Sequence, residues 1–157
     1  MRILNDRFLP VRLLQIEEDL LRFSFFDEGK LKNEITIQAG SDYVCKQYFK
    51  GDVPKDDEVE ISIYYVEETA LSNKALMNEK ESLVCNHKLL PEIFGKKLGD
   101  VISFAEIEAV NLDYFDYIAG VPASVLHLDF SKEKFTIVLI LRAIMHVLKF
   151  KDIQIAK

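Results

Sequence analysis

The sequence has no tryptophan and is poor in the residues that cross-link or interrupt a chain: it has two cysteines, four prolines and six glycines in 157 residues. Two cysteines do not make a disulfide framework, so we expect two free thiols of a reducing compartment. No stretch rich in proline, glycine or serine divides the chain. We therefore expect a single domain over residues 1–157.

Long apolar runs and an excess of basic residues are also missing. The longest apolar run, Phe135–Leu148, contains Arg142 and His146 and is shorter than the roughly 20 residues that a membrane helix needs. The segment Met1–Asp19 is interrupted by charges and does not resemble a signal peptide. The net charge of −6 opposes binding to nucleic acids and anionic membranes. These features predict a cytoplasmic protein that binds neither.

Signatures of catalysis are absent as well. The sequence has no glycine-rich phosphate loop, no GxSxG, no HExxH and no CxxC, and it has only three histidines. Cys85 and His87 would share one face of a strand, but a zinc site needs four ligands and no second pair of this kind exists. We interpret them as a buried thiol beside a surface histidine. We expect no catalytic residue, no metal ion and no cofactor.

The pattern of apolar residues predicts an α+β fold, with a mostly antiparallel sheet and helices packed on it. Val59, Ile61, Ile63 and Tyr65 alternate with polar residues, which indicates a half-buried strand. Further strands are expected at 20–26, 34–38, 101–110, 124–130 and, at the edge of the sheet, 152–156. Helices are expected at 43–50, 69–82 and 111–119. Residues 8–16 and 132–148 fit both helix and strand; we favour a strand for the first and a helix for the second.

The negative charge is concentrated in two stretches. Asp52–Glu68 contains seven acidic residues and one basic residue, and Leu98–Ser131 contains six acidic residues and no basic one. An acidic stretch is commonly a solvated face, but two that converge would form a surface that attracts a basic partner. Whether they are adjacent in space is not determined by the sequence.

Five consecutive residues in the second acidic stretch combine aromatic and acidic side chains: Asp113, Tyr114, Phe115, Asp116 and Tyr117. Aromatic residues anchor protein interfaces, and the alternative interpretation is that Tyr114 or Phe115 faces the core. On the expected strand 59–65, Glu60 and Tyr64 lie on the side away from the core. We take these seven residues as the candidate partner-binding site.

These observations favour a non-enzymatic interaction protein that binds and masks or regulates a basic protein partner, as an inhibitor or immunity protein does. Two alternatives remain. The chain could be a small hydrolase or ligand-binding domain that uses His127 and Asp129, which would share one face of the expected strand 124–130. It could also be a subunit of a homo-oligomer or larger assembly that packs through the apolar segment Lys132–Leu148.

Overall fold

The first three strands form an antiparallel meander. Two α-helices follow it before the fourth strand, and the other helices come after that strand. The structure is a computed structural model that describes residues 10–77 and 82–156. Its elements are β1 (Val11–Ile16), β2 (Leu21–Asp27), β3 (Lys30–Ile37), α1 (Ser41–Tyr48), α2 (Asp56–Leu71), the short 3-10 helix η1 (Lys74–Leu76), β4 (Ser82–Cys85), α3 (Leu90–Phe94), β5 (Val101–Ser103), α4 (Phe104–Ile118), α5 (Ala123–Leu126), α6 (Lys132–Leu148) and β6 (Asp152–Ile155). The α+β class predicted from the sequence is confirmed.

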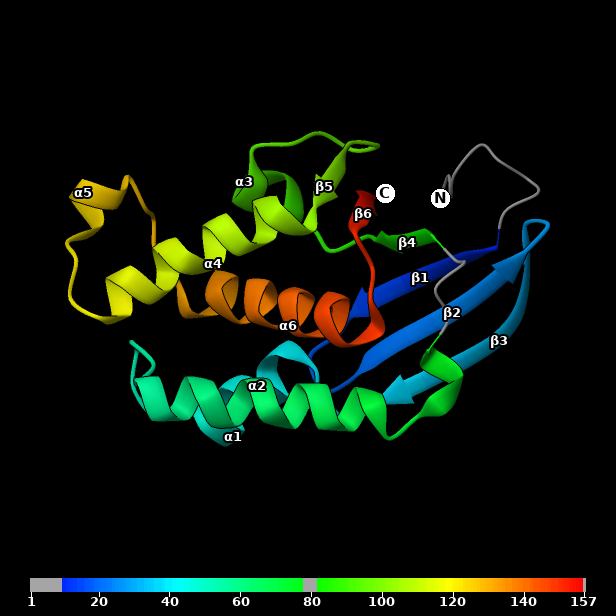
Figure 1. The fold of residues 1–157 in the computed structure, drawn as a ribbon, viewed down its shortest axis with the longest axis horizontal. Coiled ribbons are helices and arrows are strands. Elements are labelled where there is room, and N and C mark those ends of the chain that lie inside the picture. The colour runs from blue at the N-terminus through cyan, green and yellow to red at the C-terminus, as the bar shows by residue number, and fades with distance from the viewer. Residues whose placement is uncertain (1–9, 78–81, 157) are drawn as a thin grey trace.

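The sheet is mixed, so the prediction of a mostly antiparallel sheet is wrong. Its six strands lie in the order β3-β2-β1-β4-β6-β5 (Figure 1). β1 pairs with β2, β2 with β3 and β5 with β6 in antiparallel fashion, whereas β1–β4 and β4–β6 are parallel. β6 therefore lies inside the sheet and not at its edge. Parallel pairs join segments far apart in the chain, which local periodicity does not reveal.

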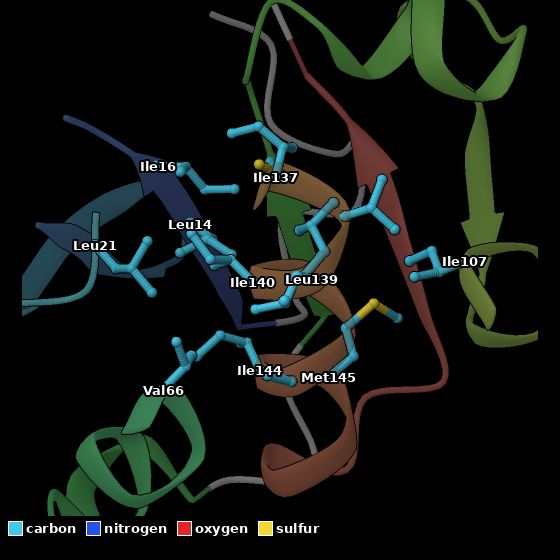
Figure 2. Close-up of a cluster of buried hydrophobic side chains, with 14 of the residues drawn as sticks. Leu14, Ile16, Leu21, Val66, Ile107, Ile137, Leu139, Ile140, Ile144 and Met145 are labelled. Carbon is cyan, nitrogen blue, oxygen red and sulfur yellow. The ribbon is translucent and has the colours of Figure 1, made fainter. Parts of the chain in front are cut away.

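The helix α6 is the centre of the hydrophobic core. Its residues Phe135–Leu141 are all buried, and Figure 2 shows its apolar side chains directed toward β1 on one side and toward Val66 of α2 and Ile107 of α4 on others. Such a continuous apolar run fits a strand or a helix. Ser131 selects the helix, because its hydroxyl accepts a hydrogen bond from the Lys134 amide at 3.0 Å.

The segment 59–65, expected to be a strand, lies inside the helix α2. Val59, Ser62, Val66 and Ala70 are buried at helical spacing, whereas Ile61 is 56% exposed. Three acidic residues, Asp56–Glu58, occupy the first turn, where they interact favourably with the helix dipole. The side chain of Glu58 also accepts a hydrogen bond from the Lys55 amide at 2.9 Å. These signals at the helix start override the alternation.

The segment expected as a strand at 101–110 divides after three residues. β5 ends at Ser103, whose hydroxyl accepts from the Glu106 amide at 3.1 Å while the Glu106 carboxylate accepts from the Ser103 amide at 2.8 Å. This reciprocal pair is a capping box, and it starts α4. The expected helix at 111–119 is the second half of α4.

Two further expectations are corrected, and the strand favoured in residues 8–16 is confirmed for its described part. Residues 124–130 form no strand, because the first of them belong to the short helix α5. The helix expected at 69–82 is not continuous: the range covers the end of α2, then η1, and the first residue of β4, and its residues 78–81 lie outside the described residues. Residues 8 and 9 of the segment 8–16 also lie outside the described residues. The rest of 8–16 contains the strand β1.

Within the described ranges, no helix is both long and apolar enough to cross a membrane.

Candidate ligand-binding pocket

A hollow of about 590 Å³ lies where the parallel strands β1 and β4 end. It is lined by the β1–β2 turn (Ile16–Leu20), by Ser41 and Asp42 at the start of α1, by His87 and Lys88 after β4, and by Glu133 at the start of α6. The carboxyl ends of parallel strands are the usual place for ligands in sheets covered by helices. We call this hollow the first lobe.

The first lobe depends on a close approach between the β1–β2 turn and α1. Gly40 precedes the helix, and a Cβ atom at this position would lie 2.4 Å from the backbone oxygen of Glu18 and from the backbone nitrogen of Leu20. The amides of Gly40, Ser41 and Tyr43 donate hydrogen bonds to the carbonyls of Asp19, Glu17 and Glu18 at 3.2, 3.0 and 3.0 Å. The helix start and the turn therefore form one backbone unit.

His87 is the histidine of the first lobe, and it is held in a defined tautomer. Its Nδ1 atom accepts a hydrogen bond from the Leu89 amide at 3.1 Å, so the ring proton of the neutral form is on Nε2. Burial lowers the pKa of His87 below its usual value, opposed by the nearby carboxylate of Glu133. At neutral pH the ring is an uncharged hydrogen-bond donor through Nε2.

Acidic side chains dominate the first lobe. Glu17 is partly compensated by Arg22, whose Nε atom lies 2.7 Å from its carboxylate, whereas Glu18 and Asp19 are exposed. Asp42 and Glu133 add two more carboxylates, against one lysine, Lys88. Among the described residues, no three His, Cys, Asp or Glu side chains gather closely enough to hold a metal ion by themselves.

A second lobe of about 350 Å³ shares a wall with the first. Ser41, Asp42 and Glu133 line both, and the second lobe adds Cys45, Lys46, Phe49 and Lys132. It runs along α1 toward its carboxyl end.

The structure does not place the aromatic residues of the Asp113–Tyr117 segment on a docking surface. Tyr114 is 2% exposed and packs edge-on against Phe130 and Phe135 at ring distances of 5.8 and 5.6 Å. Phe115 also packs against the core, and Tyr117 stacks on Phe130 at 4.6 Å. Burial raises the pKa of Tyr114 to about 12. Of the two acids, Asp116 is exposed and Asp113 is half-buried.

The other predicted site residues are accessible but lie apart. Glu60 and Tyr64 are exposed on α2, and Tyr64 is 66% exposed. The two acidic stretches form much of α2 and α4, which lie on opposite sides of α6 (Figure 1). His127 and Asp129 are exposed around the end of α5, Asp129 is 3.3 Å from Lys134, and neither lines the two lobes.

Sequence reasoning missed most of the residues that line the pocket. His87 was expected to be a surface histidine beside the Cys85 thiol, and Glu17–Asp19 belonged to the charges that argued against a signal peptide in Met1–Asp19. The signal that locates the pocket is the parallel pairing of β1 with β4, which brings residues 16–20 and 87–88 to one edge of the sheet. The local feature of the sequence that indicates such a pocket is a polar turn directly after a buried strand.

Comparison with solved structures shows which proteins share this fold. A Ppx/GppA family member from Aquifex aeolicus superposes with a TM-score of 0.76 at 13% identity over 95% of this chain and 52% of its own. The type II variant of the Aquifex aeolicus Ppx/GppA phosphatase has a TM-score of 0.74 at 12% identity, over 95% of this chain and 53% of its own. An exopolyphosphatase from Cytophaga hutchinsonii has a TM-score of 0.69 at 8% identity, over 94% of this chain and 53% of its own. The chain spans about half the length of these structures. No protein-family model and no curated protein matches the sequence.

This shared fold contradicts the prediction of a non-enzymatic, inhibitor-like or immunity-like protein that masks a basic partner. The proteins with the same fold are named as phosphatases and exopolyphosphatases, which are enzymes. The alternative of a hydrolase or ligand-binding domain is better supported, but a pocket at other residues replaces His127 and Asp129 as its candidate site.

Proposed function

We propose that this chain is a phosphoryl-ligand-binding domain of phosphatase type, and that its first lobe binds a phosphoryl group together with a divalent cation. The observation that carries the proposal is the position of the lobe at the carboxyl ends of β1 and β4, in a fold shared with Ppx/GppA phosphatases. The names of the similar structures make phosphoryl-group chemistry the activity class that we propose for the protein.

The charges of the lobe explain why a cation must accompany the phosphoryl group. A bare phosphate would meet the carboxylates of Glu18, Asp19, Asp42 and Glu133, which repel it. Carboxylate oxygens are ligands that Mg²⁺ prefers, and Mg²⁺ is commonly bound by one or two carboxylates together with substrate phosphates. Among the described residues no three His, Cys, Asp or Glu side chains form a metal site by themselves, so the cation that we propose enters with the ligand and takes part of its coordination from the phosphoryl oxygens. This departs from our expectation of a protein without metal.

Two side chains can act directly on the phosphoryl oxygens. Lys88 carries a positive charge at the rim of the lobe. The neutral ring of His87 offers its Nε2 proton as a hydrogen-bond donor, because its Nδ1 atom is occupied by the Leu89 amide. Asp42, in the first turn of α1, lines both lobes and is our candidate carboxylate for the cation.

Calorimetric titration of the full chain with methyl phosphate and with inorganic tripolyphosphate, each with and without Mg²⁺, tests the proposal. We expect saturable binding that requires Mg²⁺. Asp42→Asn should weaken this binding about ten-fold or more, because the cation loses one carboxylate ligand. Asp116→Asn, which removes an exposed acid on α4, is the matched control and should bind as the unmodified chain does. Absence of binding, or equal binding without Mg²⁺, would contradict the proposal.

A further inference from the structure

The second lobe differs in character from the acidic first lobe. Its added lining consists of Cys45, Phe49 and two lysines. The ammonium group of Lys132 donates to the backbone oxygen of Gly51 at 2.9 Å, so that its charge is held there. Phe49 is buried, with its ring 5.8 Å from that of Phe135. A sulfur atom, an aromatic ring and lysine methylene groups make a lining suited to apolar groups.

Cys45 contributes to this lining as a neutral thiol. The Thr136 hydroxyl donates to the Lys132 carbonyl at 2.7 Å, so it accepts in its 2.9 Å contact with the sulfur of Cys45. Burial raises the pKa of the Cys45 thiol above its usual value. A thiol that is mostly protonated behaves as a small apolar side chain, and only its small thiolate fraction reacts slowly as a nucleophile.

The two lobes adjoin each other and are of suitable size. Ser41, Asp42 and Glu133 belong to both linings, so a ligand with one end in the first lobe can place a second group against the adjoining second lobe. A dry cavity of about 150 Å³ is enough to bind benzene. The second lobe, with about 350 Å³, therefore has room for a ring and its linker.

The geometry points to an organic phosphate as the ligand: a phosphate monoester whose aromatic or large apolar group enters the second lobe while the phosphoryl group and its cation occupy the first. This inference rests on the proposed function, because it assigns the phosphoryl end to the first lobe. It adds the substrate class, since inorganic phosphate and phosphate chains have no group for the lining of Cys45 and Phe49.

A pair of probes that differ only in the apolar group tests the inference. With Mg²⁺ present, we expect phenyl phosphate to bind the full chain about ten- to a hundred-fold more tightly than methyl phosphate, the range that burial of an aromatic ring supports. Cys45→Leu, which adds bulk inside the second lobe, should abolish this preference, so that phenyl phosphate no longer binds more tightly than methyl phosphate. Gln47→Leu adds a leucine on the exposed side of α1 and is the matched control, which should keep the preference.

Thiol labelling of the unmodified protein gives a second readout that does not depend on the folding of a variant. Saturating phenyl phosphate should slow maleimide labelling of Cys45, as followed by mass spectrometry, whereas saturating methyl phosphate should not. Cys85 is an internal reference, because it is fully buried and its pKa is raised to about 12 by burial, so it should stay unlabelled.

The outcomes separate the inference from the function on which it rests. Equal affinity for phenyl and methyl phosphate, or labelling of Cys45 that phenyl phosphate does not slow, would overturn the organic ligand and leave the phosphoryl-binding function intact. If neither phosphate binds with Mg²⁺, the proposed function fails and the inference fails with it.

Discussion

Replacing Gly40 with alanine tests the backbone unit on which the pocket depends. The added Cβ atom would lie 2.4 Å from two backbone atoms of the β1–β2 turn, whereas the usual distance between non-bonded heavy atoms is about 3.5 Å. The turn and α1 must therefore separate by roughly 1 Å. Such a shift breaks the three hydrogen bonds that join Gly40, Ser41 and Tyr43 to the turn. At about 1 kcal/mol for each bond, we expect Gly40→Ala to lower the free energy of unfolding by about 3 kcal/mol.

Urea unfolding measures this loss. With a slope of about 2 kcal/mol per molar urea, the midpoint should fall by about 1.5 M. Gly51→Ala is the matched control, because a Cβ atom there would meet its nearest neighbour, the Val53 oxygen, at an ordinary 3.7 Å. That variant should be neutral or more stable by about 0.5 kcal/mol, through the reduced freedom of the unfolded chain. If the two variants unfold at the same urea concentration, the close approach at Gly40 does not exist as described.

Two other predictions concern individual side chains. Because burial lowers the pKa of His87, the unfolded chain binds more protons than the folded chain between that lowered value and about 6.5, so stability should fall as the pH drops through this window. His87→Asn should flatten the dependence of the urea midpoint on pH, and an unchanged slope would contradict the assignment. Tyr114→Ala should cost about 3–5 kcal/mol, because the ring is buried against two phenylalanines. Tyr64→Ala should change stability by less than about 0.5 kcal/mol, because this ring is exposed, and equal losses in the two variants would refute the burial.

The elements that could be predicted from the sequence are those whose signals are local. The β2–β3 hairpin is one, because Glu28 and Gly29 both take positive φ, 53° and 76°, in the two-residue turn that joins the strands. The turn after α3 is another local signal, since Gly95 takes the left-handed conformation, with φ of 62°, in which glycine commonly ends a helix.

The elements that were missed carried two local signals in conflict. In α2, alternation of Val59, Ile61 and Ile63 favoured a strand, but burial follows the helical spacing because the helix packs against α6. At Ser103 the capping-box spacing to Glu106 was present in the sequence and was outweighed by the alternation around Ile102. The signals at the helix starts and the packing of the helices on α6 act together against the alternation, and the packing is not visible in a window of ten residues.

The pocket could not be predicted from the sequence for a different reason. Its lining comes from the turn after β1, the residues after β4 and the starts of α1 and α6. These segments are far apart in the sequence, from Ile16 to Glu133. Only the parallel pairing of β1 with β4 and the packing of α1 on α6 bring them together. No segment among them matches a known phosphate motif, so the sequence alone predicted no site there.

Each of the acidic helices α2 and α4 has one carboxylate in contact with α6. The two helices flank α6 on opposite sides (Figure 1). Glu67 of α2 is 2.8 Å from His146, and Glu108 of α4 is 3.3 Å from Arg142. These contacts place one carboxylate of each acidic stretch against the central helix. Because the two acidic helices lie on opposite sides of α6, the two stretches form no single acidic face.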